Sequence, residues 1–170
     1  MFLLHRMRYF ITFACSGAHL HGDDAGSVDR EHNLFGGRLL ETSSEWVASE
    51  RMTMGRESYW MDRNSREAVL TTLKEVCEFR GWTLLAAHVR TNHVHAIAES
   101  EAKPEKLLGD FKVYASRALN RLEPNEPNQK RWARHGSTRW LWTDKDVRSA
   151  IKCVIEEQGQ PMAVFDAGLI

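Results

Sequence analysis

The chain has 170 residues, of which 42% are hydrophobic and 27% charged, a composition that excludes a disordered or fibrous protein and predicts one domain over 1–170. Its 23 basic and 23 acidic residues cancel to zero formal charge, which excludes attraction of the whole molecule to a polyanion. No apolar run approaches the ~18 residues of a membrane span, and three cysteines without a short-spaced pair (Cys15, Cys77, Cys153) favour a reducing compartment, so we expect a cytoplasmic protein with no membrane partner.

The first predicted element is a strand over residues 8–15, which is rich in aromatic and β-branched side chains. A long loop is expected at about 17–46, because glycine, aspartate and asparagine positions interrupt any periodic pattern there. A loop of this length is unusual in a compact domain and is typical of either a functional or a disordered segment.

Apolar residues then recur at three- and four-residue spacing over 64–81, which predicts a helix. Asn64 or Ser65 is available as the N-terminal cap of this helix, and Gly81 is expected to end it.

Two strands joined by a short turn are predicted next, over 82–89 and 93–98. A second amphipathic helix begins at Pro104 and extends to about residue 122. An aromatic run at 140–142 indicates another strand, and a capping pattern at Thr143 begins a last helix that ends near Gln158.

The order of these elements is strand, helix, strand, strand, helix, strand, helix, which predicts an α+β fold. We expect a ferredoxin-like sandwich with an antiparallel sheet of about four to five strands. Helices should cover one face of this sheet, with a C-terminal helix in addition.

His93 and His95 carry the first chemical signal. Side chains two residues apart in a strand point to the same face, so the two imidazoles can share one metal ion. From spacing alone, ordinary polar residues on a solvent-facing sheet are the more frequent alternative, and His19 and His21 form a second such pair. The small apolar residues on the opposite face indicate a rigid strand, which favours the metal site.

The string His-Val-Arg-Thr-Asn-His-Val-His at 88–95 stands among three further distinctive segments, at 26–33, 111–120 and 132–142. In this order they resemble the HUH single-tyrosine transposases, the group that includes insertion-sequence transposases and REP-associated tyrosine transposases. Four ordered segments are far more specific than one His-x-His pair.

The resemblance implies a small α+β enzyme, usually a homodimer, that cuts and rejoins single-stranded DNA at hairpin-marked sites. Its chemistry is transesterification: a divalent metal on the two histidines polarises the scissile phosphate, and a tyrosine attacks the phosphorus, forming a 5′-phosphotyrosine link and a free 3′-hydroxyl. Mg²⁺ or Mn²⁺ suits such a site, and no nucleotide cofactor is needed because the link conserves the phosphodiester energy.

The last predicted helix departs from the family pattern, in which Tyr-x-x-x-Gln supplies both the nucleophile and a metal ligand, because this helix has no tyrosine. If Cys153 occupies the tyrosine position, Glu157 becomes the third ligand; if Val154 does, Gln158 keeps that role. Helical periodicity favours the Cys153 register. A thiolate can attack phosphorus, yet free cysteine is mostly protonated at neutral pH, and a small residue filling the space of the missing tyrosine is the more frequent alternative.

Tyr114 is a second candidate nucleophile, because it is the one tyrosine that follows the histidine pair on a predicted helix. It lies in the apolar stripe of that helix, so a core tyrosine with a bonded hydroxyl is the alternative.

Local charge supports a nucleic-acid partner. Between residues 112 and 139 there are seven basic residues and two acidic ones, and the last of the basic residues are interleaved with Trp132, Trp140 and Trp142. Arginines beside tryptophans provide phosphate contacts and stacking surfaces for single-stranded DNA, although a solvated basic face with tryptophans anchoring the sheet is the alternative. The DNA-binding candidates are Lys112, Arg117, Arg131, Trp132, Arg134 and Arg139.

These patterns together predict a transposase-like domain that binds single-stranded or hairpin DNA and cleaves it with a divalent metal. Because the expected tyrosine is missing, a domesticated or catalytically inactive hairpin-binding protein of the same fold is the alternative. An unrelated metal-binding ferredoxin-like protein would require the four-segment match to be a coincidence.

Overall fold

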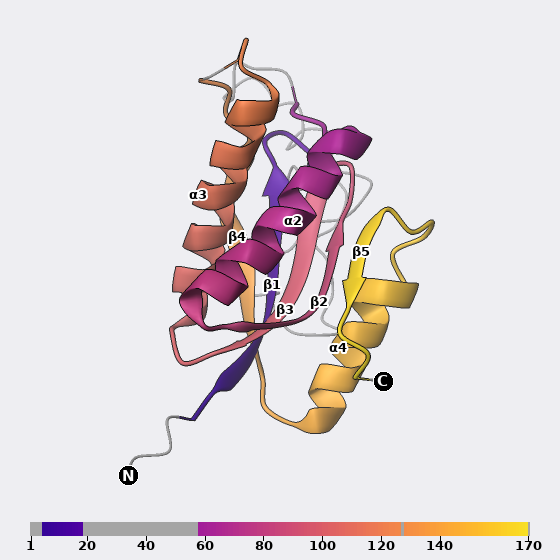
Figure 1. Cartoon of the computed structure of the whole chain (residues 1–170). Helices are drawn as coiled ribbons and strands as arrows, with labels where there is room; N and C mark the ends of the chain where they lie inside the picture. The colour runs from indigo at the N-terminus through magenta and orange to yellow at the C-terminus, as the bar shows by residue number, and fades with distance from the viewer. Residues whose placement is uncertain (1–4, 19–57, 127, 170) are drawn as a thin grey trace, which may run out of the picture.

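Five strands form one antiparallel sheet in the order β4-β1-β3-β2-β5 in the computed structural model, which describes residues 5–18, 58–126 and 128–169 (Figure 1). The strands are β1 (Met7–Cys15), β2 (Thr83–Val89), β3 (His93–Ser100), β4 (Trp132–Leu141) and β5 (Ala163–Asp166); the helices are α2 (Arg63–Arg80), α3 (Pro104–Leu122) and α4 (Asp144–Glu156). The first four strands in this order make the ferredoxin-like α+β sandwich, so the predicted fold class is confirmed. Almost all of the loop expected at about 17–46 lies outside the described residues.

The cap of α2 differs from the prediction. The carboxylate of Asp62 caps the helix by accepting a hydrogen bond from the backbone N–H of Ser65, at 2.8 Å. The hydroxyl of Ser65 donates instead to Glu123, near the end of α3. Gly81 ends the helix in the left-handed conformation, with φ of 70°, as expected for a residue without a Cβ.

Two strands differ more clearly from the prediction. The predicted strand at 140–142 is only the end of β4, which begins at Trp132; its polar middle hides the strand pattern because β4 is an edge strand paired with β1 alone. β5 pairs with the outer edge of β2 and was not located by the sequence pattern, since four residues are too few to show a period.

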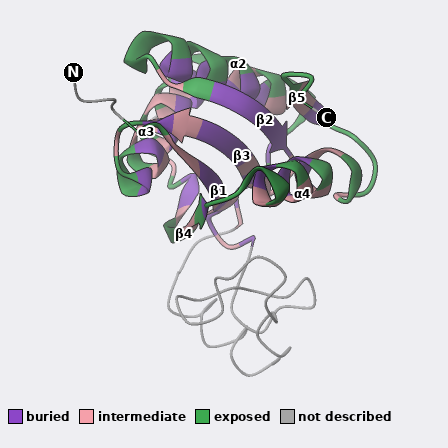
Figure 2. Cartoon of the chain, turned by 90° about the horizontal axis from the view of Figure 1, so that it is seen from below, coloured by how far each residue is buried: buried purple, intermediate pink, exposed green. Residues whose placement is uncertain are grey.

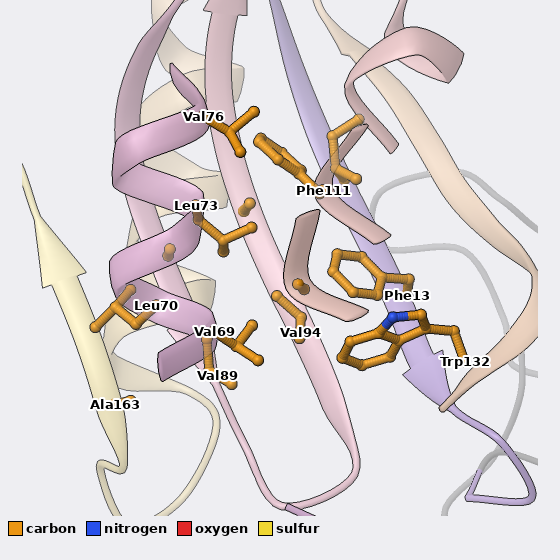
Figure 3. Packing of buried hydrophobic residues seen from close by; sticks show 14 of the residues in the cluster. Phe13, Val69, Leu70, Leu73, Val76, Val89, Val94, Phe111, Trp132 and Ala163 are labelled. Carbon is orange, nitrogen blue, oxygen red and sulfur yellow. The ribbon is translucent and has the colours of Figure 1, made fainter. Parts of the chain in front are cut away.

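Helices cover the two faces of the sheet unequally (Figure 2). On one face, α2 and α3 enclose the larger core, in which Leu73 and Phe111 lie close to Phe13 of β1 (Figure 3). On the other face α4 is the one helix among the described residues, and it buries Ile151 and Val154 in a smaller core. Each such side chain contributes about 1.5–3 kcal/mol on burial, so the helix is held mainly by its apolar stripe.

The N-terminus of α4 has the predicted capping box. The hydroxyl of Thr143 accepts from the N–H of Asp146, and the Asp146 carboxylate accepts from the N–H of Thr143, each at 3.0 Å. Within the described ranges, none of the helices combines the length and apolar character that crossing a membrane requires.

Candidate functional site

The histidine pair lies on the α4 face of the sheet. In β3, Val94 and Ala96 point into the larger core, whereas Ile97 belongs to the smaller core beneath α4. By strand alternation His93 and His95 share the face of Ile97, and their ring centroids are 4.7 Å apart with planes at 73°. The structure therefore brings the two imidazoles side by side.

Each imidazole has a polar partner at Nδ1. His93 Nδ1 lies 2.7 Å from Oδ1 of Asn92, and His95 Nδ1 lies 2.8 Å from Oγ1 of Thr12 on β1. When Nδ1–H donates to these oxygens, each Nε2 keeps its lone pair, which is the arrangement of metal-ligating histidines.

Gln158, two residues beyond the end of α4, reaches His95 of this pair. Its Oε1 lies 3.1 Å from Nε2 of His95, while its amide nitrogen donates to the carbonyl of Cys153. The helix ends at Glu156, so helical spacing no longer predicts the direction of residues beyond it. Glu157, which would be the third ligand in the Cys153 register, is exposed. In the described part of the chain, no three His, Cys, Asp or Glu side chains lie close enough together to hold a metal ion.

The donor set fits a divalent ion. An octahedral ion with bonds of ~2.1 Å places neighbouring ligand atoms ~3.0 Å apart, close to the 3.1 Å between Gln158 Oε1 and His95 Nε2. Imidazole nitrogens with an amide oxygen suit Mn²⁺, and suit Mg²⁺ when water completes the site. The residues that would hold the ion are therefore His93, His95 and Gln158.

Cys153 lies beside this group as a thiol. Its Sγ is 3.7 Å from the amide nitrogen of Gln158. Burial raises the pKa of Cys153 and the nearby Glu157 carboxylate adds to this, while the Gln158 hydrogen bond and Arg139 act in the opposite direction. The net raised pKa keeps the sulfur protonated at neutral pH and makes it a weak nucleophile.

Tyr114 does not reach the histidines. It packs partly buried against the larger core, on α3, so the sheet separates it from His93 and His95. The sequence did not predict on which face of the sheet Tyr114 lies, because an apolar stripe does not reveal which face its helix covers. The other two tyrosines also belong to the larger core, where the Tyr9 hydroxyl donates to Ala102 O and the Tyr59 hydroxyl to Glu123.

Arg131 is buried and bonded within the fold. Only 3% of it is accessible, and its guanidinium pairs with Glu123, donates to Asn120 and lies over the ring of Tyr59. Its burial beneath α3 and residue 59 leaves little of its surface for the DNA contact that the sequence predicts.

Trp132 and Lys112 are also held within the fold. The indole N–H of Trp132 donates to the Lys112 carbonyl and the Ser116 hydroxyl, and the ring packs edge-on against Phe13 (Figure 3). The ammonium of Lys112 donates to two backbone carbonyls of β4, at Ala133 and His135, and burial lowers its pKa. Both side chains therefore have partners within the fold, Trp132 as a buried residue and Lys112 as a partly buried one.

The remaining candidates are more accessible. Arg117 and Arg134 are exposed, and Arg139 is half-buried, with its guanidinium 5.9 Å from the ring centroid of Phe10. Phe10 belongs to the smaller core, so Arg139 adds positive charge to the face that carries the histidines. At the end of β4, the exposed rings of Trp140 and Trp142 are stacked, with centroids 5.1 Å apart and planes at 10°.

Two polar residues of this face were missed by the sequence analysis, Thr12 and His88. His88 is fully buried and lies opposite His95 in the β2–β3 hairpin. Its Nδ1 donates to the Val154 carbonyl, and its Nε2 accepts from the N–H of Met162. Burial lowers the pKa of His88, the charge of Arg90 acts in the same direction, and the bond to Val154 opposes them. The predicted strand ends, residues 89 and 93, would have set His88 opposite Val94, whereas the structure pairs Val89 with Val94 and His88 with His95, so the sequence held no signal for this pair.

A ferredoxin-like antiparallel sheet that presents an Asn-His-Val-His pair beneath its last helix defines a protein of the HUH class. Residues 46–155 match the family model described as "Transposase IS200 like", and the chain belongs to this family. The match contains the histidine pair and most of α4, but not the segment at 26–33.

Two solved structures are similar to the chain at low identity. One is a REP-associated tyrosine transposase bound to a REP hairpin, with 12% identity and a TM-score of 0.48, covering 89% of this chain and 66% of the other. The second, a Deinococcus radiodurans protein described as a candidate transposase, has 15% identity and a TM-score of 0.46, covering 91% of this chain and 92% of the other. No curated protein matches the chain.

Proposed function

We propose that this protein binds single-stranded or hairpin DNA and holds a divalent metal at His93, His95 and Gln158, without forming a phosphotyrosine link. One observation carries the proposal. The two histidines lie beside Gln158 and are hydrogen-bonded to Thr12 and Asn92, while all three tyrosines of the chain pack in or against the larger core on the other face of the sheet. The metal would supply positive charge that polarises a phosphate.

The chain's own residues have distinct roles in this proposal. Thr12 and Asn92 orient the imidazoles, and Arg139 offers a cation for a DNA phosphate on the same face. Arg117 and Arg134 would add exposed phosphate contacts. Membership of a transposase family makes DNA the expected partner.

Cleavage by Cys153 is the second candidate, favoured by the 3.7 Å contact between its Sγ and the Gln158 amide. In that reaction the thiol loses its proton, sulfur bonds to phosphorus, and the bond from phosphorus to the departing oxygen breaks to leave a 3′-hydroxyl. The raised pKa of Cys153 disfavours this route at neutral pH.

The test uses a labelled hairpin oligonucleotide with single-stranded flanks, incubated with Mn²⁺ and the full chain. We expect retention on a native gel and no covalent adduct on a denaturing gel. Cys153→Tyr should gain adduct because it returns a phenol beside Gln158, and Cys153→Phe, which lacks the hydroxyl, is its matched control.

Two outcomes would redirect the proposal. An adduct formed by the unaltered chain and lost in Cys153→Ala would establish the cysteine route. An adduct lost in Tyr114→Phe would show that the tyrosine reaches the DNA and would contradict both candidates. A homodimer and a cytoplasmic location belong to the same proposal; analytical ultracentrifugation tests the dimer and fractionation of the source cells tests the location.

A further inference from the structure

Two side chains of the β2–β3 hairpin form hydrogen bonds with the end of α4 and with the connection between α4 and β5. This connection carries Gln158, and it lies against the same hairpin that carries the histidine pair. His88 lies near the end of β2, and Arg90 follows that strand directly.

The contacts bracket Gln158 in the sequence. Before it, His88 Nδ1 lies 2.9 Å from the carbonyl oxygen of Val154. After it, the N–H of Met162 donates to His88 Nε2 at 3.1 Å, and the Arg90 guanidinium donates to the Gln160 carbonyl at 2.9 Å. Side chains of the hairpin thus bind one backbone group near the end of α4 and two in the connection, on either side of Gln158.

A neutral histidine suits this position because one ring nitrogen donates while the other accepts. Nδ1 of His88 donates to the carbonyl of Val154 near the end of α4, and Nε2 accepts from the N–H of Met162 just before β5. Arg90 adds a charged hydrogen bond in the turn between them.

We propose that His88 and Arg90 are positioning residues that hold the α4–β5 connection so that Gln158 faces His95. The inference rests on the proposed metal site, because its functional consequence is a ligand already in place before the ion arrives. Because the connection is already ordered, metal binding does not include the entropy cost of ordering it.

The test is a double-mutant cycle on Mn²⁺ affinity in the full chain, measured by electron paramagnetic resonance. Arg90→Ala and Gln158→Ala should each weaken binding by about tenfold or more. The double variant should bind no more weakly than Gln158→Ala, because Arg90 acts through Gln158. Arg66→Ala is the matched control, since its guanidinium also donates to a backbone carbonyl, that of Met61, at 2.9 Å but on α2.

A second readout needs no metal. In heteronuclear NMR spectra, the side-chain amide resonances of Gln158 should be shifted from free-amide positions in the unaltered chain. They should move toward those positions in Arg90→Ala and in a folded His88→Gln variant, but not in Arg66→Ala. Unchanged Gln158 resonances in Arg90→Ala, or additive losses of Mn²⁺ affinity in the cycle, would overturn the inference. If the unaltered chain does not bind Mn²⁺, the metal site is overturned and the NMR comparison alone decides the positioning role.

Discussion

The hydroxyl of Thr12 lies 2.8 Å from Nδ1 of His95, across the pairing of β1 with β3. The two residues are direct partners in the register, so the sheet itself aligns the hydroxyl with the ring. This contact orients the imidazole so that its Nε2 lies toward Gln158.

Removing the Thr12 hydroxyl should therefore weaken metal binding. Thr12→Val keeps the branched shape but loses the oxygen, and we expect Mn²⁺ affinity to fall about 10- to 100-fold, as for other groups that orient a ligand. Titration monitored by electron paramagnetic resonance measures the change. Thr138→Val, on β4, is the control; equal affinities for Thr12→Val and the unaltered chain would refute the orienting role.

Arg131 and Arg134 should separate stability from DNA binding. Arg131→Ala leaves Glu123 without its buried partner and should lower the free energy of unfolding by about 3 kcal/mol. Arg134→Ala should leave unfolding unchanged and reduce the salt dependence of DNA binding by about one counterion. Urea denaturation and binding titrations at several salt concentrations measure the two effects. A stable Arg131→Ala protein with weakened DNA binding would reverse the assignment.

The sequence predicted those parts of the fold and site that follow from local spacing. Alternation placed His93 and His95 on one face, and Thr143 with Asp146 marked the start of α4. It could not place Arg131, because an arginine has the same sequence signal whether it lies in solvent or under α3. Gln158 was ambiguous for another reason: it follows the end of α4, where a helical register no longer applies.

The stacked indoles at the end of β4 should contribute to DNA binding. Trp142 is 66% exposed, so Trp142→Ala should weaken binding of single-stranded DNA by about 1–3 kcal/mol if one base stacks there. Trp60→Ala is the control, because Trp60 is 55% exposed but is not part of the stacked pair of Trp140 and Trp142. Fluorescence anisotropy with a labelled hairpin measures both. Equal losses in the two variants would indicate a nonspecific effect of removing an indole.

The thiol of Cys153 should react slowly at neutral pH. Because its pKa is raised above the ordinary value of 9.0, the thiolate fraction at pH 7 is smaller than in a free cysteine. Alkylation by iodoacetamide, followed by mass spectrometry, should therefore accelerate at a higher pH than alkylation of a free cysteine. A midpoint below that of free cysteine would favour the cysteine route to cleavage.

Two glycines should respond oppositely to alanine. A Cβ at Gly136 would lie 2.7 Å from the carbonyl oxygen of Thr12 and 2.9 Å from a methyl carbon of Leu108, so Gly136→Ala should destabilise the β1–β4 pairing. A Cβ at Gly109, within α3, meets nothing within 4 Å, so Gly109→Ala should stabilise the protein by about 0.5–1 kcal/mol. Thermal unfolding of both variants measures the sign; stabilisation by Gly136→Ala would contradict the close approach.

The unequal cores on the two faces divide the molecule into parts of different local stability. Among the described residues, far fewer side chains are buried beneath α4 than beneath α2 and α3. Opening of α4 alone therefore costs less free energy than unfolding the sheet, and its amides should exchange with solvent first. An ion that joins the histidines of β3 to Gln158 would couple this helix to the rest of the molecule, so binding at the site would be recorded as slower hydrogen exchange along α4.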